Sequence, residues 1–120
     1  MRELVFGFMF LLAFAARAAD VVLIQTGKSF VQGIDETKAA AIAEDHDEVK
    51  KYTVPALKIK TGDVVHFNNV DSVKHNVMLE DHFNFIQEPG SRESYQFHKA
   101  GEYDVRCAIH PKMKIKVTVE

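Results

Sequence analysis

Residues 103–119, YDVRCAIHPKMKIKVTV, carry the chain's only cysteine between two stretches of alternating side chains. The first five and the last six of these residues alternate with period two, which is typical of strands with one buried face. The residues between them include a proline, so we expect a loop at one end of a sheet. This loop holds three metal-ligand side chains at a spacing of three residues, namely Cys107, His110 and Met113.

The donor types in this loop point to a copper ion. Thiolate and thioether donors select copper(I), and imidazole binds copper in either oxidation state. A second imidazole is available from His75, at the start of another short strand. Two imidazoles, one thiolate and a distant thioether form the ligand set of a type 1 copper site for electron transfer. The predicted ligands are therefore His75, Cys107, His110 and Met113.

The remaining pattern is mostly that of short strands separated by turns. Val21–Gln25 is rich in β-forming residues, and residues 58–68 alternate on both sides of Thr61-Gly62-Asp63. The latter pattern predicts a tight hairpin or a bend between strands. A turn at Glu88–Ser91 precedes a further alternating run at Arg92–His98. Short strands at this spacing predict an all-β sandwich or barrel.

Residues 35–52, DETKAAAIAEDHDEVKKY, are the exception to the strand pattern. The segment opens with Asp35, a good N-cap, and its apolar residues recur at helical spacing. We expect one inserted helix of about four turns, packed on an edge or end of the sandwich.

The N-terminal segment has the features of an export signal. Leu4–Ala16 is an unbroken apolar run of 13 residues, shorter than the roughly 20 that a membrane-spanning helix needs. Small residues at Ala16 and Ala18 predict cleavage before Ala19. A buried N-terminal strand or an uncleaved anchor are the alternatives. We expect residues 1–18 to be a cleaved signal peptide and residues 19–120 to form a single periplasmic domain.

Composition excludes several classes of protein. The 120 residues carry 15 basic and 17 acidic side chains, a balance that gives no reason to expect nucleic-acid binding. A single cysteine excludes an internal disulfide and a four-cysteine zinc site. It is also unusual in an oxidising compartment unless it is buried or held by a metal. We find no general acid–base pair, and we expect a monomer that is not an enzyme and does not insert stably in a membrane.

Four motifs in order resemble those of the cupredoxins, the type 1 copper proteins of the plastocyanin, amicyanin and pseudoazurin kind. They are Lys58-x-Lys60-x-Gly62-Asp63-x-Val65-x-Phe67-x-Asn69, Asp71-x-x-x-His75-Asn76-Val77, Phe97-x-x-x-Gly101-x-Tyr103-x-x-x-Cys107 and Cys107-x-x-His110-Pro111-x-Met113. The resemblance covers most of residues 53–120. It implies a Greek-key β-sandwich, the same four copper ligands, and single-electron transfer between redox protein partners. It also implies that His110 is the exposed electron port and that the Asn76 N–H reaches the Cys107 sulfur.

The resemblance is not complete. The helical segment is an insertion relative to plastocyanin-like members, and Ile109 stands where plastocyanin and amicyanin have proline. We expect the Ile109 N–H to donate to the Cys107 thiolate and so favour copper(I). A copper chaperone or storage module, or a metal-free secreted sandwich, remain alternative functions. Either the lysines near the ligand loop or the acidic residues 44–48 are candidates to dock a partner. The other histidines are assigned to structure or surface, namely His46, His66, His82 and His98.

Overall fold

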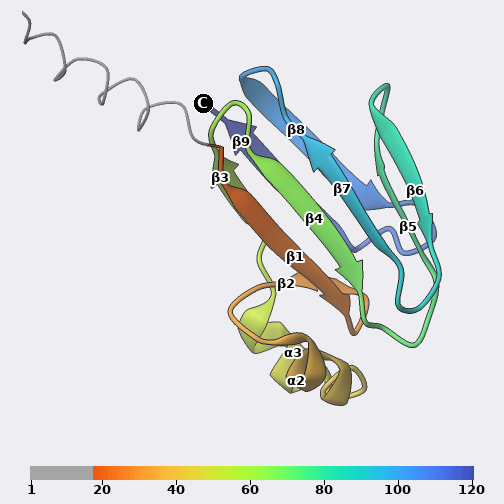
Figure 1. The fold of residues 1–120 in the computed structure, drawn as a ribbon. Helices are drawn as coiled ribbons and strands as arrows, with labels where there is room; N and C mark the ends of the chain where they lie inside the picture. The colour runs from red at the N-terminus through yellow and green to blue at the C-terminus, as the bar shows by residue number, and fades with distance from the viewer. Residues whose placement is uncertain (1–17) are drawn as a thin grey trace, which may run out of the picture.

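The computed structural model describes residues 18–120, which fold into two β-sheets packed face to face (Figure 1). The four-stranded sheet has the order β2 (Ser29–Val31), β1 (Asp20–Thr26), β4 (Val64–Asn69) and β7 (Arg92–Gln96). The five-stranded sheet has the order β3 (Ala56–Ile59), β9 (Lys114–Val119), β8 (Gly101–Cys107), β5 (His75–Leu79) and β6 (Phe83–Gln87). The predicted all-β sandwich is confirmed.

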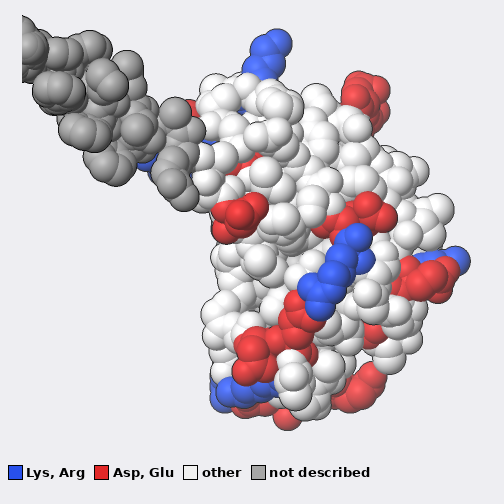
Figure 2. Space-filling view, viewed as in Figure 1, with Lys and Arg blue, Asp and Glu red and all other residues white. Residues whose placement is uncertain are grey.

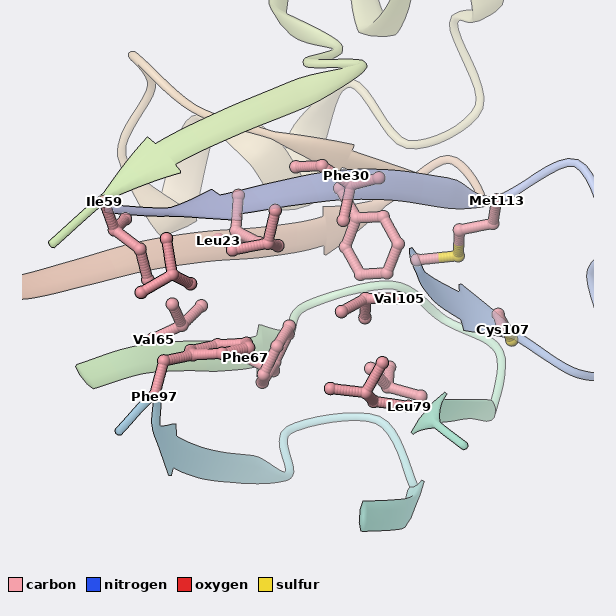
Figure 3. Packing of buried hydrophobic residues seen from close by; sticks show 14 residues of the cluster. Leu23, Phe30, Ile59, Val65, Phe67, Leu79, Phe97, Val105, Cys107 and Met113 are labelled. Carbon is pink, nitrogen blue, oxygen red and sulfur yellow. The ribbon is translucent and has the colours of Figure 1, made fainter. Parts of the chain in front are cut away.

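The main core lies between the two sheets. Inward-facing residues alternate with exposed ones along β8 and β9, so Val105, Ile115 and Val117 are buried while their neighbours face water. Phe67 of β4 is fully buried, and its ring lies 6.3 Å from that of Phe30 and 5.7 Å from that of Phe83. Figure 3 shows this packing, with Cys107 and Met113 at one end of the same core.

Thr61-Gly62-Asp63 forms the bend that carries the chain from one sheet to the other. It follows β3 and precedes β4, which belong to different sheets, so the bend is not a hairpin. The Asp63 N–H donates to the Lys60 carbonyl at 3.0 Å, and Gly62 has a φ of +95° that other residues rarely adopt. The sequence had left these two possibilities open.

The inserted segment differs from the single helix that we expected. It forms two short helices, α2 (Glu36–Ala41) and α3 (His46–Tyr52). The break occurs because the Asp45 side chain accepts the Glu48 N–H at 3.2 Å and so caps a second helix. The predicted position at an end of the sandwich is correct (Figure 1). There Ala39 and Val49 pack on Ile24 and Val31 in a separate small core.

The edge strand β6 was not predicted, and the separation of β2 from β1 was not predicted either. The predicted signal peptide, residues 1–18, lies outside the described residues apart from Ala18. Within residues 18–120, no helix is both long enough and apolar enough to cross a membrane.

Candidate metal centre

Neighbouring strands of the five-stranded sheet bring the candidate ligands together. His75 begins β5 and Cys107 ends β8, and Val77 of β5 lies opposite Cys107 in the antiparallel pair. The side chains of His75 and Cys107 are both fully buried, because each occupies an inward position of its strand. The loop that leads from β8 to β9 then supplies His110 and Met113 at the same end of the sandwich.

Backbone hydrogen bonds hold the 108–113 loop in a compact shape. The Cys107 N–H donates to the Met113 carbonyl at 2.9 Å, and the Met113 N–H donates to the His110 carbonyl at 2.8 Å. The Ala108 N–H donates to the Asn76 carbonyl at 3.0 Å and ties the loop to the start of β5. The loop therefore positions its side chains through main-chain geometry as well as through packing.

Three donor atoms surround a space of the right size for a metal ion. The Nδ1 atoms of His75 and His110 lie 3.0 Å apart, and each lies 3.7 Å from the Cys107 sulfur. A triangle with these sides has its equidistant point about 2 Å from each corner, which is an ordinary distance from a first-row metal ion to nitrogen and slightly short for sulfur. Two imidazoles and a thiolate around one point fit copper.

The fourth predicted ligand, Met113, is buried near this cluster. Its side chain is only 2% exposed and belongs to the main core. Figure 3 shows the Met113 thioether and Cys107 at the same end of that core. A thioether buried at this end of the core is a candidate fourth ligand, since type 1 copper sites combine two imidazoles and a thiolate with a weakly bound thioether.

Asp71 contacts His75 on the side away from the other donors. Its Oδ2 lies 2.9 Å from the His75 Nε2, and Asp71 is only 4% exposed. Burial would raise the pKa of Asp71, but hydrogen bonds from His75 and from the Lys28 and Ser72 N–H groups hold that pKa below its usual value. The charged carboxylate favours the His75 tautomer whose Nδ1 lone pair is free for a metal. Asp71 lies within one of the motifs of the sequence, but its spacing to His75 did not predict this role.

The Cys107 sulfur accepts one backbone hydrogen bond in residues 18–120, and it comes from Asn76. The nitrogen lies 3.3 Å from Sγ, as the resemblance implied. The expected bond from the Ile109 N–H is not present in this described part of the chain. Ile109 instead turns its side chain outward, where it is 51% exposed.

His110 is the candidate ligand that reaches the surface. It is half-buried, whereas His75 and Cys107 are enclosed. Burial, followed by the nearby His75 and Lys28, lowers the pKa of His110, which favours a neutral imidazole able to bind a metal. A surface hollow of about 530 Å³ surrounds it, with Ile109 and Lys112 among the lining residues.

The remaining histidines do not join the donor cluster. His66 bonds to Ser94 at 2.6 Å and to Asp20 at 2.9 Å on the outer face of the four-stranded sheet. His82 bonds to the Tyr95 hydroxyl at 3.2 Å. His46 is exposed at the start of α3 and lines the hollow at His110, a position that nothing in the sequence indicated.

Comparison with known proteins agrees with this geometry. A family model described as copper binding proteins of the plastocyanin/azurin family matches residues 38–120. Amicyanin of Paracoccus denitrificans is 33% identical over 123 residues, covering 92% of this chain and 88% of that protein. Amicyanin of Paracoccus versutus is 35% identical over 80 residues, covering 61% of each chain. The crystal structure of the latter protein superposes with a TM-score of 0.59 at 23% identity, covering 88% of this chain and 83% of that one, and so supports the fold.

Proposed function

Because the chain belongs to the plastocyanin/azurin family of copper-binding proteins, we propose that His75, Cys107, His110 and Met113 are its copper ligands. The protein is a small blue copper protein that binds one type 1 copper ion and transfers single electrons. The observation that carries the ligand assignment is the convergence of two Nδ1 atoms and one Sγ atom at mutual distances of 3.0 and 3.7 Å. Family membership does not favour the chaperone or the metal-free alternative.

Each side chain has a separate task in this proposal. A bound copper ion supplies one-electron chemistry by alternating between copper(II) and copper(I). His75 is held from behind by Asp71, so its Nδ1 stays aimed at the site. Cys107 provides the thiolate, and the Asn76 N–H withdraws some of the sulfur's charge. Met113 would supply its buried thioether as a further, weaker donor to copper.

His110 is the proposed route for the electron to the surface. It is the only one of the four proposed ligands that is not buried, and it opens onto the hollow lined by Ile109 and Pro111. An apolar surface around a half-exposed ligand allows a partner to approach and exclude water from the contact. The partner proposed here is another redox protein that receives or donates one electron at this surface.

We also propose export to the periplasm through cleavage of residues 1–18. Support comes from the 13-residue apolar run that precedes Ala16-Arg17-Ala18. A single buried thiol that is held by copper is protected from oxidation in such a compartment.

A panel of ligand variants tests the assignment. Cys107→Ser is expected to abolish the intense blue thiolate-to-copper absorption, and His75→Ala is expected to weaken copper binding strongly. Met113→Leu is expected to keep the blue colour and raise the reduction potential, because a weak axial donor to copper(II) is lost. His98→Asn is the matched control, since His98 is exposed and lies outside the cluster. A blue band that survives in Cys107→Ser would contradict the assignment.

A further inference from the structure

The backbone nitrogen of Ala19 meets a carboxylate at the end of β1 that lies away from the copper site. Ala19 precedes β1, whereas the turn after β1 lines the hollow at His110. The Ala19 nitrogen donates to Asp63 Oδ1 at 2.9 Å, and the Ala19 carbonyl accepts the Val64 N–H at 2.9 Å. Both main-chain polar groups of Ala19 are therefore bonded where the bend meets β4, at Asp63 and Val64.

Asp63 is held rigidly in the position from which it reaches Ala19. It is only 7% exposed, and its second oxygen accepts the Lys60 N–H at 2.8 Å. Its own N–H donates to the Lys60 carbonyl, and its carbonyl accepts the Phe97 N–H, each at 3.0 Å. The carboxylate is therefore fixed by the backbone before any contact with Ala19 is made.

The residue that this carboxylate holds is also the first residue after the predicted cleavage site. Ala16 and Ala18 supply the small side chains that a signal peptidase requires, and the bond that follows them joins Ala18 to Ala19. Ala18 and Ala19 are both exposed. The cleavage pattern lies in the sequence and the carboxylate contact lies in the fold, and both involve the same nitrogen atom, that of Ala19.

We propose that cleavage between Ala18 and Ala19 creates an α-ammonium group that Asp63 binds as an N-terminal clamp. The inference rests on the export that is part of the proposed function. Water hydrolyses the Ala18–Ala19 peptide bond on a peptidase of the export pathway. The carboxylate remains on the released segment, and the new amine of Ala19 takes up a proton.

The clamp is stronger for the cleaved chain than for the uncleaved one. In the cleaved chain the amide N–H donor is replaced by a cation with three donors, so a full positive charge meets the Asp63 carboxylate and the attraction of an ion pair is added to the hydrogen bond. Among residues 18–120, the charged groups that line the surrounding hollow besides Asp63 are Lys58, Lys60 and Glu120. Lys58 lies 3.5 Å from the Glu120 carboxylate, so these two charges largely offset each other.

The cleavage is tested by the mass of the protein recovered from the periplasm of an exporting host. The expected protein starts at Ala19, and a different first residue would overturn the proposal. The blue colour of the same sample reports on the copper site separately, so the failure of one idea does not imply failure of the other.

The clamp is tested on two copper-loaded proteins prepared by removing a tag, one starting at Ala19 and one with a single Gly before Ala19. The extra Gly keeps an N–H at the Ala19 nitrogen but moves the charge away. We expect the unfolding temperature of the Ala19 form to be higher by about 5 °C at pH 6. Asp63→Asn is expected to remove this difference. Equal unfolding temperatures of the two proteins would refute the clamp, even if Asp63→Asn does not fold.

The pH dependence gives a second readout on the same two proteins. Binding by Asp63 raises the pKa of the ammonium above the ordinary value of roughly 7.7–8.0 for an α-amine. The extra stability of the Ala19 form is therefore fully present below that ordinary value, and it is lost as pH rises through the raised pKa. A difference that persists unchanged at pH 11 would be inconsistent with an ammonium clamp.

Discussion

Asp71 is the residue through which we expect the site's redox properties to be adjusted without a change of ligand. Its carboxylate accepts the His75 Nε2–H and makes the opposite nitrogen a better donor. Asp71→Asn keeps an oxygen at this position but removes the charge. We expect copper(II) affinity to fall by about 10- to 100-fold. Because the binding of copper(II) is weakened more than the binding of copper(I), the reduction potential should rise. Chelator competition and voltammetry measure the two effects.

The control for this change is Asp104→Asn, which removes the same charge from an exposed position on β8. If both variants shift the potential equally, net charge and not the contact with His75 is responsible. An unchanged potential in Asp71→Asn would show that the buried pair does not act on the copper site.

At the residue scale, the sequence indicated the donors and, through the resemblance, the Asn76 N–H at the Cys107 sulfur, but not the role of Asp71. Cys107, His110 and Met113 stand close together in one loop, so their spacing was visible, and His75 stood at a strand start. The contact between Asp71 and His75 depends on the fold of the 71–75 loop and on the Lys28 N–H from another turn, so spacing alone did not reveal it. The prediction of a hydrogen bond from the Ile109 N–H to the Cys107 sulfur was wrong, because the orientation of an N–H in a loop is set by the loop's own hydrogen bonds.

The turn after β1 packs closely against α3, and this contact predicts a difference between two glycine variants. A Cβ on Gly27 would lie 2.7 Å from Val49 Cγ2, whereas a Cβ on Gly33 would meet nothing within 4 Å. Both glycines have positive φ values, +56° and +78°, so both substitutions carry a similar cost for placing alanine in a left-handed backbone conformation. We expect Gly33→Ala to lower the free energy of unfolding by about 1 kcal/mol. Gly27→Ala should lower it by about 1–3 kcal/mol more.

Urea denaturation of the two variants measures this difference directly. Equal losses would mean that α3 moves away from the added methyl group at no cost. The inserted helices would then be only loosely attached to the sandwich.

The elements that the sequence predicted best are those with a clear period. β8 and β9 alternate strictly because one face of each is buried, and both were predicted. The three-residue β2 is too short to show a period, and β6 ends in an exposed isoleucine, Ile86, and a buried glutamine, Gln87, which break its apolar–polar alternation. The continuous apolar spacing of residues 35–52 hid the break, which depends on the local cap made by Asp45.

The distribution of charge over the whole molecule predicts how partners approach. Figure 2 shows acidic side chains gathered at the end that carries α2 and α3. Within the part of the chain that the structure describes, the only Lys, Arg, Asp or Glu residues lining the hollow at His110 are nevertheless Lys28 and Lys112. We therefore expect the rate of oxidation by hexacyanoferrate(III) to fall with added salt, although the chain's net charge is negative. Stopped-flow measurement of the reduced protein gives this rate.

Two charge-reversal variants separate the effect of charge beside His110 from the effect of the net charge of the protein. Lys112→Glu should slow the reaction by about threefold or more. Lys58→Glu changes the net charge equally but lies at the other end of the sandwich, beside Ala19, and should have a smaller effect. A rate that rises with salt, or equal effects of the two variants, would place the approach at the acidic helices instead.

A copper(II) titration of residues 19–120, followed by visible absorption and electron paramagnetic resonance, tests the central claim most directly. The donor cluster predicts an intense blue thiolate-to-copper band and narrow hyperfine splitting that saturate at one equivalent. A colourless product, or the spectrum of ordinary square-planar copper, would show that His75, Cys107, His110 and Met113 do not act as a type 1 site.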